Sequence, residues 1–505
     1  MLKEIKTTEL RAYANSYYRQ GKNKLLAMFG ADEQLLNGYF AIYCVFQNNS
    51  TSNPSINILK ACFPENSDLT YPSLTPLIPA ANWYEREMAD MFGFIALEHP
   101  DLRPLVLHEN YPEKTYPLRK KFAANTKLKH KPQVFNYPKV EGEGVFEVPV
   151  GPIHAGIIEP GHFIFSQAGE TVLNLEAKLF FTHRGIEKNL EGLSPVQALY
   201  LVERICGACA VSHALSFTQA IENLGEHKVS KRAQLFRVFI AELERIYNHI
   251  GDTGNICAGI GFAPIISHCS RLKEYIMRIN EDISGNRFLR GAIIIGGVNK
   301  DISVLKVREI ISVLNDIERE YLSMVDSMYK QQEFVNRVST TGIVPNHLAK
   351  EGAFSGIAAR ATGILSDTRK DFPYLVYDEL NFKIITEQTG DVDARIKVRI
   401  AEVQESLKIL RQITPLLDQV DDQPLFTEIG ALKTNTLSIG MSESARGNNL
   451  HALIIDSQQN IYRTFVRSAS YSNWPALPIA APNNIIPDFP LINKSFELCY
   501  ACLDR

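Results

Sequence analysis

The stretches 203-ERICGACAVSH-213 and 495-SFELCYACLDR-505 carry the same Cys-x-x-C spacing at two distant places in the chain. Terminal segments are usually polar and poorly ordered, so two thiols this close to the last residue predict that something holds the segment inside the protein. In a reducing cytoplasm, pairs at this spacing indicate metal or redox chemistry rather than structural disulfides. The other four cysteines stand singly, as buried apolar side chains do: Cys44, Cys62, Cys257 and Cys269.

The two cysteine pairs admit three interpretations. The pairs of a Cys₄ zinc site usually lie within a few tens of residues, whereas more than half of this chain separates Cys209 from Cys499. Two unrelated redox pairs would leave the position of the second pair unexplained. A catalytic metal held by four thiolates explains both pairs, because the metal itself would bury the second one. His213, four residues after Cys209, shares its helical face and could donate an N–H to a coordinating sulfur, although a structural histidine is the alternative.

Length and composition describe an ordinary globular protein. A chain of 505 residues predicts more than one domain, and 45% hydrophobic and 22% charged residues are typical values. A net charge of −3 gives no reason to expect a nucleic-acid partner. Apolar runs such as 292-AIIIGGV-298 are too short to cross a bilayer, and the first residues lack a signal peptide. We therefore expect a cytoplasmic protein that reaches a membrane only through partner subunits.

Hydrophobic patterning predicts a small N-terminal α/β domain over residues 1–125. A helix-like pattern at 7–20 alternates with a strand-like run at 38–46. The basic run that begins at Arg119 is typical of a solvated segment, and we interpret residues 126–139 as a linker.

Long helical patterns dominate residues 140–505, which we predict to form one large, mainly helical domain. The clearest helix begins at Ser230 as N-cap and carries an apolar stripe as far as Ile250. Further amphipathic stretches occupy 305–335 and 395–420. The expected fold class of the whole chain is α+β.

These blocks resemble the large subunits of nickel–iron (NiFe) hydrogenases, in the complex I-related, membrane-associated group that includes formate hydrogenlyase and hydrogenase-4. The blocks that carry the resemblance are 183-HRGIEK-188, 204-RICGAC-209, 443-ESARG-447, 470-SYSNWP-475 and 499-CYACLDR-505. In the N-terminal domain, 85-EREMADMFGF-94 and 99-HPDLR-103 resemble the 30 kDa subunit of complex I. The resemblance implies a 30 kDa-like domain fused to a catalytic domain that is also similar to the 49 kDa subunit of complex I.

The resemblance implies a role for each cysteine of the two pairs. Cys206 and Cys499 would be terminal ligands of nickel, and Cys209 and Cys502 would bridge nickel to an iron that carries CO and two cyanide ligands. Soft thiolates suit such a centre. The single cysteines are too scattered to hold a Cys₄ iron–sulfur cluster, so we expect no such cluster in this chain.

The resemblance also implies roles for residues around the metals. Arg446 would place its permanently charged guanidinium over the open metal position, and the alternative is a structural salt bridge. Ser470 would donate a hydrogen bond to a cyanide ligand.

Two carboxylates complete the expected set. Glu159 would relay the proton released by H₂ splitting, unless it caps a loop backbone. Glu187 would bind a magnesium or iron ion near the C-terminus, with a surface salt bridge to Arg184 or Lys188 as the alternative.

Two positions depart from the family pattern. Glu497-Leu498 stands where Asp-Pro usually precedes the last pair, and Ala445 replaces the proline of the arginine block. Because proline fixes φ, we expect looser local geometry without the loss of a ligand. A stop at Arg505 matches the mature end that a maturation endopeptidase leaves in this family, and a gene that simply ends there would look the same.

The expected function is the reversible reaction 2H⁺ + 2e⁻ ⇌ H₂, in the catalytic subunit of a membrane-associated complex. The implied partners are a small subunit with a 4Fe–4S cluster, a ferredoxin-like subunit, integral membrane proton-translocating subunits and a formate dehydrogenase. The complex would lie at the inner face of the cytoplasmic membrane. The alternatives are a complex I-type quinone-site subunit, whose relatives lack the full cysteine set, and a structural zinc protein.

Overall fold

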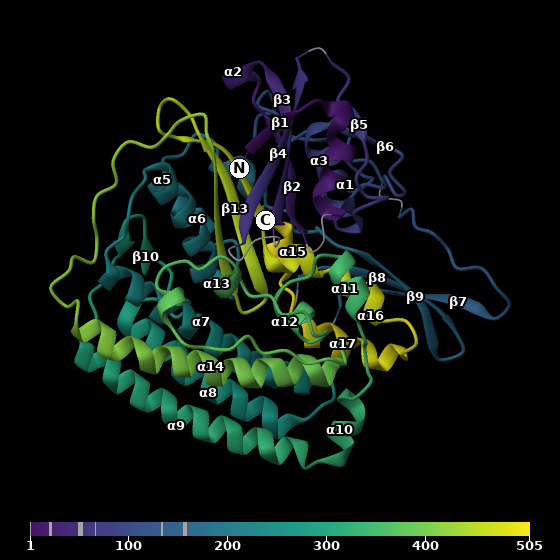
Figure 1. Ribbon diagram of the computed structural model, residues 1–505. Coiled ribbons are helices and arrows are strands. Elements are labelled where there is room, and N and C mark those ends of the chain that lie inside the picture. Colours follow the sequence, from purple (N-terminus) through teal and green to yellow (C-terminus); the bar gives the residue numbers. More distant parts are fainter. Residues whose placement is uncertain (1, 20–22, 49–53, 66, 133–134, 155–158) are drawn as a thin grey trace.

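The computed structural model describes residues 2–19, 23–48, 54–65, 67–132, 135–154 and 159–505. A small sheet domain lies above a larger domain whose long helices form the opposite end of the molecule (Figure 1). This α+β architecture confirms the predicted fold class. In the part of the chain that the structure describes, no helix is both long and apolar enough to span a bilayer.

The N-terminal domain is built on a four-stranded mixed sheet in the order β1-β4-β3-β2. Its strands are β1 (Leu2–Ile5), β2 (Lys24–Asp32), β3 (Tyr39–Asn48) and β4 (Ser55–Pro64), of which β1 and β4 are parallel and the other neighbours antiparallel. The remaining elements are η1 (Thr7–Glu9), α1 (Leu10–Arg19), α2 (Gln34–Asn37), β5 (Thr70–Pro72), η2 (Pro79–Ala81), α3 (Asn82–Phe92) and β6 (Ile95–Leu97). β2 and β3 are buried along nearly their whole length, as expected of strands covered on both faces.

Four long helices form the frame of the larger domain. They are α7 (Lys231–Ala258), α8 (Ala263–Ser284), α9 (Val304–Tyr329) and α14 (Val392–Asp418). α7 begins where the sequence predicts, because the Ser230 side chain accepts a hydrogen bond from the backbone N–H of Ala233. This helix is buried on nearly all sides, which places it at the centre of the domain.

The larger domain also contains two three-stranded antiparallel sheets. One is formed by β12 (Leu437–Ser444), β13 (Gly447–Ile455) and β14 (Ile461–Arg467), and the other by β7 (Val145–Val150), β8 (His162–Ala168) and β9 (Thr171–Lys178). The remaining elements are α4 (Ile186–Leu190), α5 (Pro195–Val202), α6 (Ala210–Leu224), β10 (Ile293–Ile294), β11 (Gly297–Val298), α10 (Gln332–Val338), α11 (Asn346–Glu351), α12 (Gly356–Arg360), α13 (Thr368–Asp371), η3 (Tyr377–Glu379), α15 (Ala469–Asn473), α16 (Ala476–Ala480), η4 (Ile486–Asp488), α17 (Phe489–Phe496) and α18 (Tyr500–Asp504).

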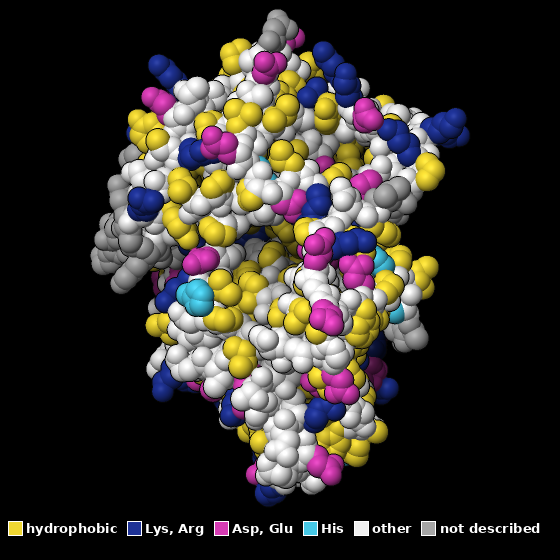
Figure 2. Space-filling view, turned by 90° about the vertical axis from the view of Figure 1, so that its right-hand side faces the viewer, with side chains coloured by type: hydrophobic (Ala, Val, Ile, Leu, Met, Phe, Trp, Pro, Cys, Tyr) yellow, Lys and Arg dark blue, Asp and Glu magenta, His cyan; other side chains and the backbone are white. Residues whose placement is uncertain are grey.

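The two domains meet where β2 lies against β14. The rings of Phe29 and Phe465 stack with centroids 4.7 Å apart. Arg467 donates from Nε to the carbonyl of Leu26 (3.0 Å). Aromatic stacking and buried hydrogen bonds therefore join the domains. The surface of the molecule is hollowed between its upper and lower parts (Figure 2).

The basic segment is only partly solvated. Residues 121–132 are largely exposed, as predicted. The Arg119 side chain, however, packs on the N-terminal domain, where it donates to the carbonyl of Phe92 (2.7 Å). Lys120 reaches across to the larger domain and pairs with Glu191 (2.8 Å). The expectation of a solvated run is wrong for these two side chains, because each finds a specific partner. The boundaries of the predicted linker at 126–139 stay a prediction.

Replacing Phe29 by alanine should loosen the contact between the domains. Phe29 stacks on both Tyr43 and Phe465, and removing a buried phenyl ring costs about 3–5 kcal/mol. We expect a lower unfolding temperature and faster proteolysis between the domains. Leu35→Ala is the control, because the Leu35 side chain is 77% exposed. Equal behaviour of the two variants would show that the stacked rings do not hold the interface.

Candidate metal centre

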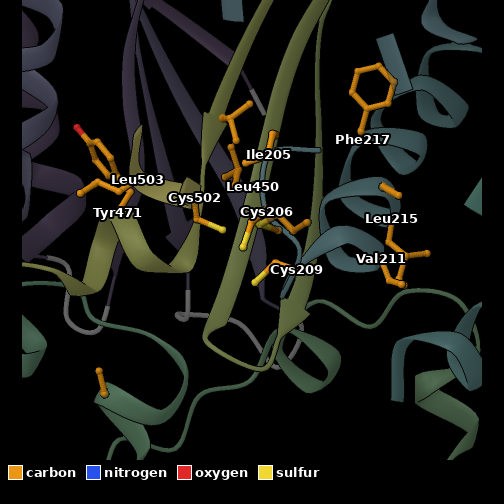
Figure 3. Packing of buried hydrophobic residues seen from close by; sticks show 14 of the residues in the cluster. Ile205, Cys206, Cys209, Val211, Leu215, Phe217, Leu450, Tyr471, Cys502 and Leu503 are labelled. Carbon is orange, nitrogen blue, oxygen red and sulfur yellow. The ribbon is translucent and has the colours of Figure 1, made fainter. Parts of the chain in front are cut away.

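The four paired cysteines converge on one point. Cys206 and Cys209 lie on the loop between α5 and α6. Cys499 is the N-cap of α18, and Cys502 lies in the first turn of that helix. Their four sulfur atoms lie within 4.8 Å of one another. Figure 3 shows the sulfurs of Cys206, Cys209 and Cys502 turned toward a shared space. The remote pairs meet, as the sequence predicts, and their role as metal ligands stays a prediction.

Polar side chains of α7 hold the first pair in place. Tyr247 donates from its hydroxyl to the carbonyl of Gly207 (3.3 Å), and Asn248 donates to the carbonyl of Ala208 (2.7 Å). One turn earlier, Glu244 accepts the N–H of Val211 (2.7 Å) at the start of α6. Burial raises the pKa of Glu244 to about 7, and the backbone N–H donors oppose this shift.

Serines at the start of α15 hold the second pair. Ser470 accepts the backbone N–H of Cys499 (3.0 Å), and Ser468 donates to the carbonyl of Cys502 (2.9 Å). The expected ligand-binding serine, Ser470, is therefore next to the cluster. Its hydroxyl still carries a donor.

His213 contacts the cluster directly. Its Nε2 lies 3.5 Å from the sulfur of Cys502, and its Nδ1 lies 3.0 Å from Nε2 of His451. Burial lowers the pKa of His213 to about 3 and that of His451 well below its usual value, so both rings are neutral. If Nε2 of His213 donates to the sulfur, its Nδ1 must accept from His451. His451 is missing from the sequence prediction because a buried histidine on a strand carries no motif.

Each of the four thiols changes the pKa of the others. Hydrogen bonding with Cys209 holds the pKa of Cys206 well below its usual value, while burial raises the pKa of Cys502 well above it. A group of coupled thiols loses its first proton readily, and each later proton is harder to remove. Binding a cation would favour the deprotonated forms, because metal ligands are thiolates.

Arg446 lies at the turn between β12 and β13 and faces α7. Its two terminal nitrogens each donate to one oxygen of Asp252 at 2.9 Å, and its Nε donates to the carbonyl of Glu497 (2.8 Å). Burial opposes the charge of Arg446, but Asp252 outweighs it and raises the pKa of Arg446 well above the usual value. The fork-to-fork pair fixes the orientation of the guanidinium beside the cysteine cluster. Sequence reasoning did not assign a role to Asp252 or Glu497.

The arginine turn is tightly held despite Ala445. Arg446 donates its N–H to the Ser444 hydroxyl (3.1 Å), and its carbonyl accepts from Asn473 (3.2 Å). Gly356, at φ +60°, packs against this turn so closely that a Cβ would lie 2.2 Å from the Arg446 carbonyl oxygen. Neighbouring side chains and a glycine thus supply the rigidity that proline would give.

Glu159 is half-buried. Burial raises the pKa of Asp504 to about 6, and the charge of Glu159 contributes to this shift. Burial also raises the pKa of Tyr500, the neighbour of Cys499, and the charge of Glu159 contributes to this shift. The carboxylate is therefore near the cysteine-bearing helix, and its role as a proton relay stays a prediction.

Glu187 is buried in an ion-pair cluster rather than exposed. It contacts Arg463 (2.7 Å) and Arg505 (3.0 Å). The expected alternative partners are engaged elsewhere: Arg184 donates to the carbonyl of Ala501, and Lys188 pairs with Glu191. Two guanidinium groups at one carboxylate do not fit a divalent cation at the same oxygens.

Family models match both domains of this chain and the region of the first cysteine pair. The family model described as the 30 Kd subunit of respiratory-chain NADH dehydrogenase matches residues 4–127, and that of the 49 Kd subunit matches 259–433 and 429–505. The nickel-dependent hydrogenase model matches residues 184–251, around the first cysteine pair. Both halves of the predicted resemblance are confirmed.

Individual relatives extend over nearly the whole chain. Formate hydrogenlyase subunit 5 of Escherichia coli (strain K12) is 33% identical over 97% of this chain and 86% of its own. Hydrogenase-4 component G of the same organism is 32% identical over 97% and 85%. A chain in the solved structure of the membrane-bound sulfane sulfur reductase, an archaeal respiratory membrane complex, superposes with a TM-score of 0.66 at 25% identity, covering 73% of this chain and all of that one.

The cysteine set, the fused 30 kDa-like domain and these matches lead to one assignment. The chain belongs to the family of complex I-related NiFe hydrogenase large subunits that includes formate hydrogenlyase subunit 5 and hydrogenase-4 component G.

Proposed function

We propose that this chain interconverts H₂ with protons and electrons at a nickel–iron centre held by Cys206, Cys209, Cys499 and Cys502. The observation that carries the proposal is the convergence of these four sulfurs within 4.8 Å. Four soft thiolates suit nickel, and the family includes nickel-dependent hydrogenases. Cys206 and Cys499 would bind nickel alone, while Cys209 and Cys502 would bridge to an iron with CO and cyanide ligands.

When bound, the centre would supply the redox site at which H₂ is formed or split. The chain's own residues would control charge and protons around it. Arg446, locked by Asp252, presents a fixed positive charge beside the sulfurs. His213, whose Nε2 lies 3.5 Å from the Cys502 sulfur, would donate to that sulfur and so moderate its negative charge. Glu159, half-buried near the same helix, would carry protons between the centre and solvent.

Partners follow from the family. The relatives include subunits of membrane-bound complexes, so we propose peripheral attachment to the inner face of the cytoplasmic membrane. A small subunit with a 4Fe–4S cluster, a ferredoxin-like subunit and proton-translocating membrane subunits would complete the complex. Formate dehydrogenase would supply the electrons, and an endopeptidase would act during maturation.

Metal analysis of the purified complex tests the centre itself. We expect one nickel per chain and infrared bands of metal-bound CO and cyanide. A quinone-site subunit would contain no nickel and give no such bands. A structural zinc protein would contain zinc instead, so each result identifies one of the three hypotheses.

Cys499→Ala should abolish nickel retention and H₂ production together, because a terminal ligand cannot be replaced by a methyl group. The control is Cys62→Ala, which removes a half-buried thiol in the N-terminal domain outside the cluster. Nickel content by elemental analysis and H₂ production by gas chromatography are the measurements. Nickel at the wild-type level in Cys499→Ala would contradict the ligand assignment.

Arg446→Lys should retain the metals but lower turnover by about a hundredfold. Lysine keeps the charge yet cannot make the two parallel hydrogen bonds to Asp252, so the cation is no longer held in position. Turnover and nickel content should be measured on the same sample, with Arg319→Lys, an exposed arginine, as the matched control. Wild-type turnover in Arg446→Lys would remove this side chain from the mechanism.

A further inference from the structure

We propose that the guanidinium of Arg505 is the built-in cation of a buried carboxylate pocket formed by Glu87 and Glu187, in the place where a divalent metal ion is expected. Glu87 belongs to α3 of the N-terminal domain, and Glu187 to α4 of the larger domain. One arginine side chain thus forms an ion pair with a carboxylate from each domain. The inference does not depend on the nickel–iron centre.

The contacts around Arg505 are direct. Its Nη1 lies 3.0 Å from Oε1 of Glu187, and its Nη2 lies 2.7 Å from Oε2 of Glu87. The other oxygen of Glu187 accepts from Arg463 (2.7 Å), and Oε1 also accepts the N–H of Val466 (2.9 Å). Each oxygen of Glu187 therefore already has a donor at hydrogen-bond distance.

The charges of the pocket balance without a metal. Two carboxylates face two guanidinium groups, and all four side chains are at most 8% exposed. A magnesium or similar ion would need these oxygens at about 2.0–2.6 Å, the position that the arginine N–H groups now occupy. It would also add two positive charges to a balanced buried cluster, where an unpaired charge is costly.

The surroundings suit a planar organic cation. The Arg505 guanidinium lies 4.8 Å from the ring centre of Tyr471 and 5.7 Å from that of Phe465. Aromatic faces attract guanidinium groups but offer no oxygen ligands to a hydrated metal ion. The aromatic rings and the carboxylates therefore both favour a guanidinium group at this position.

The pocket links the N-terminal domain to the cysteine-bearing helix. Arg505 follows Cys502 by three residues, and its carbonyl accepts the N–H of Arg184 (3.0 Å). Thr182 donates its N–H to Asp504 (3.0 Å). Through Glu87, the N-terminal domain therefore helps to fix the segment that carries the second cysteine pair.

The test is the response of the full chain, in its complex, to divalent ions. The wild-type protein is treated with a chelator, and its unfolding temperature is measured before and after the addition of Mg²⁺, Mn²⁺ or Fe²⁺ under anaerobic conditions. We expect no release of Mg²⁺ or Mn²⁺ from this chain and the same unfolding temperature in every sample. A stoichiometric ion lost to the chelator, with a fall in unfolding temperature that the ion reverses, would overturn the proposal.

Removing the arginine should create the metal site that the wild-type protein lacks. In Arg505→Ala, two buried carboxylates face Arg463 alone, so we expect an unfolding temperature several degrees lower that Mg²⁺ or Mn²⁺ partly restores. The double variant Arg505→Ala/Glu187→Gln should lose this restoration. Arg319→Ala, which removes an exposed guanidinium, is the control and should match the wild type. An Arg505→Ala protein as stable as this control would also refute the proposal, and the wild-type measurement decides the matter if the variant does not fold.

Discussion

Four thiols brought together in a buried space are the constraint on which the rest of the structure depends. Sulfurs within 4.8 Å of one another cannot all ionise without a cation, and burial removes the water that would screen them. The chain meets this constraint by placing positive charge nearby and fixing it. Arg446 approaches from a strand turn, and its orientation is determined by Asp252 on the central helix.

The central helix α7 explains why a mainly apolar domain can hold such a polar site. Most of its surface packs in the core, yet one face presents Glu244, Tyr247, Asn248 and Asp252. The first three hold the loop and helix start that bear the first cysteine pair, and the fourth holds Arg446. Because one rigid helix supports both the first cysteine pair and the guanidinium of Arg446, it fixes their relative positions.

The sequence predicts the parts of this arrangement that follow from periodicity and spacing. The start of α7 at Ser230, the α+β class and the meeting of the two cysteine pairs are confirmed. It does not reveal Asp252 or His451, because a single polar residue in an apolar helix or strand is compatible with many environments until its partner is known. Glu187 shows the same limit: its motif suggests a metal ligand, while its partners, Arg463 and Arg505, lie far along the chain.

Buried arginines perform one physical task at two places in this fold. At the cysteine cluster, Arg446 and Asp252 form a bidentate pair that keeps a guanidinium beside the buried thiols. At the domain junction, Arg505 pairs with carboxylates from both domains, and Arg463 supplies the second positive charge. A guanidinium is preferred to a metal ion at the second place, because it is covalently attached and cannot be lost by dilution or chelation. Its hydrogen bonds also have fixed directions, so it orients the helix that carries Cys499 and Cys502, whereas a hydrated ion would accept many arrangements. The fused N-terminal domain is therefore part of the support of the cysteine cluster and not a separate appendage.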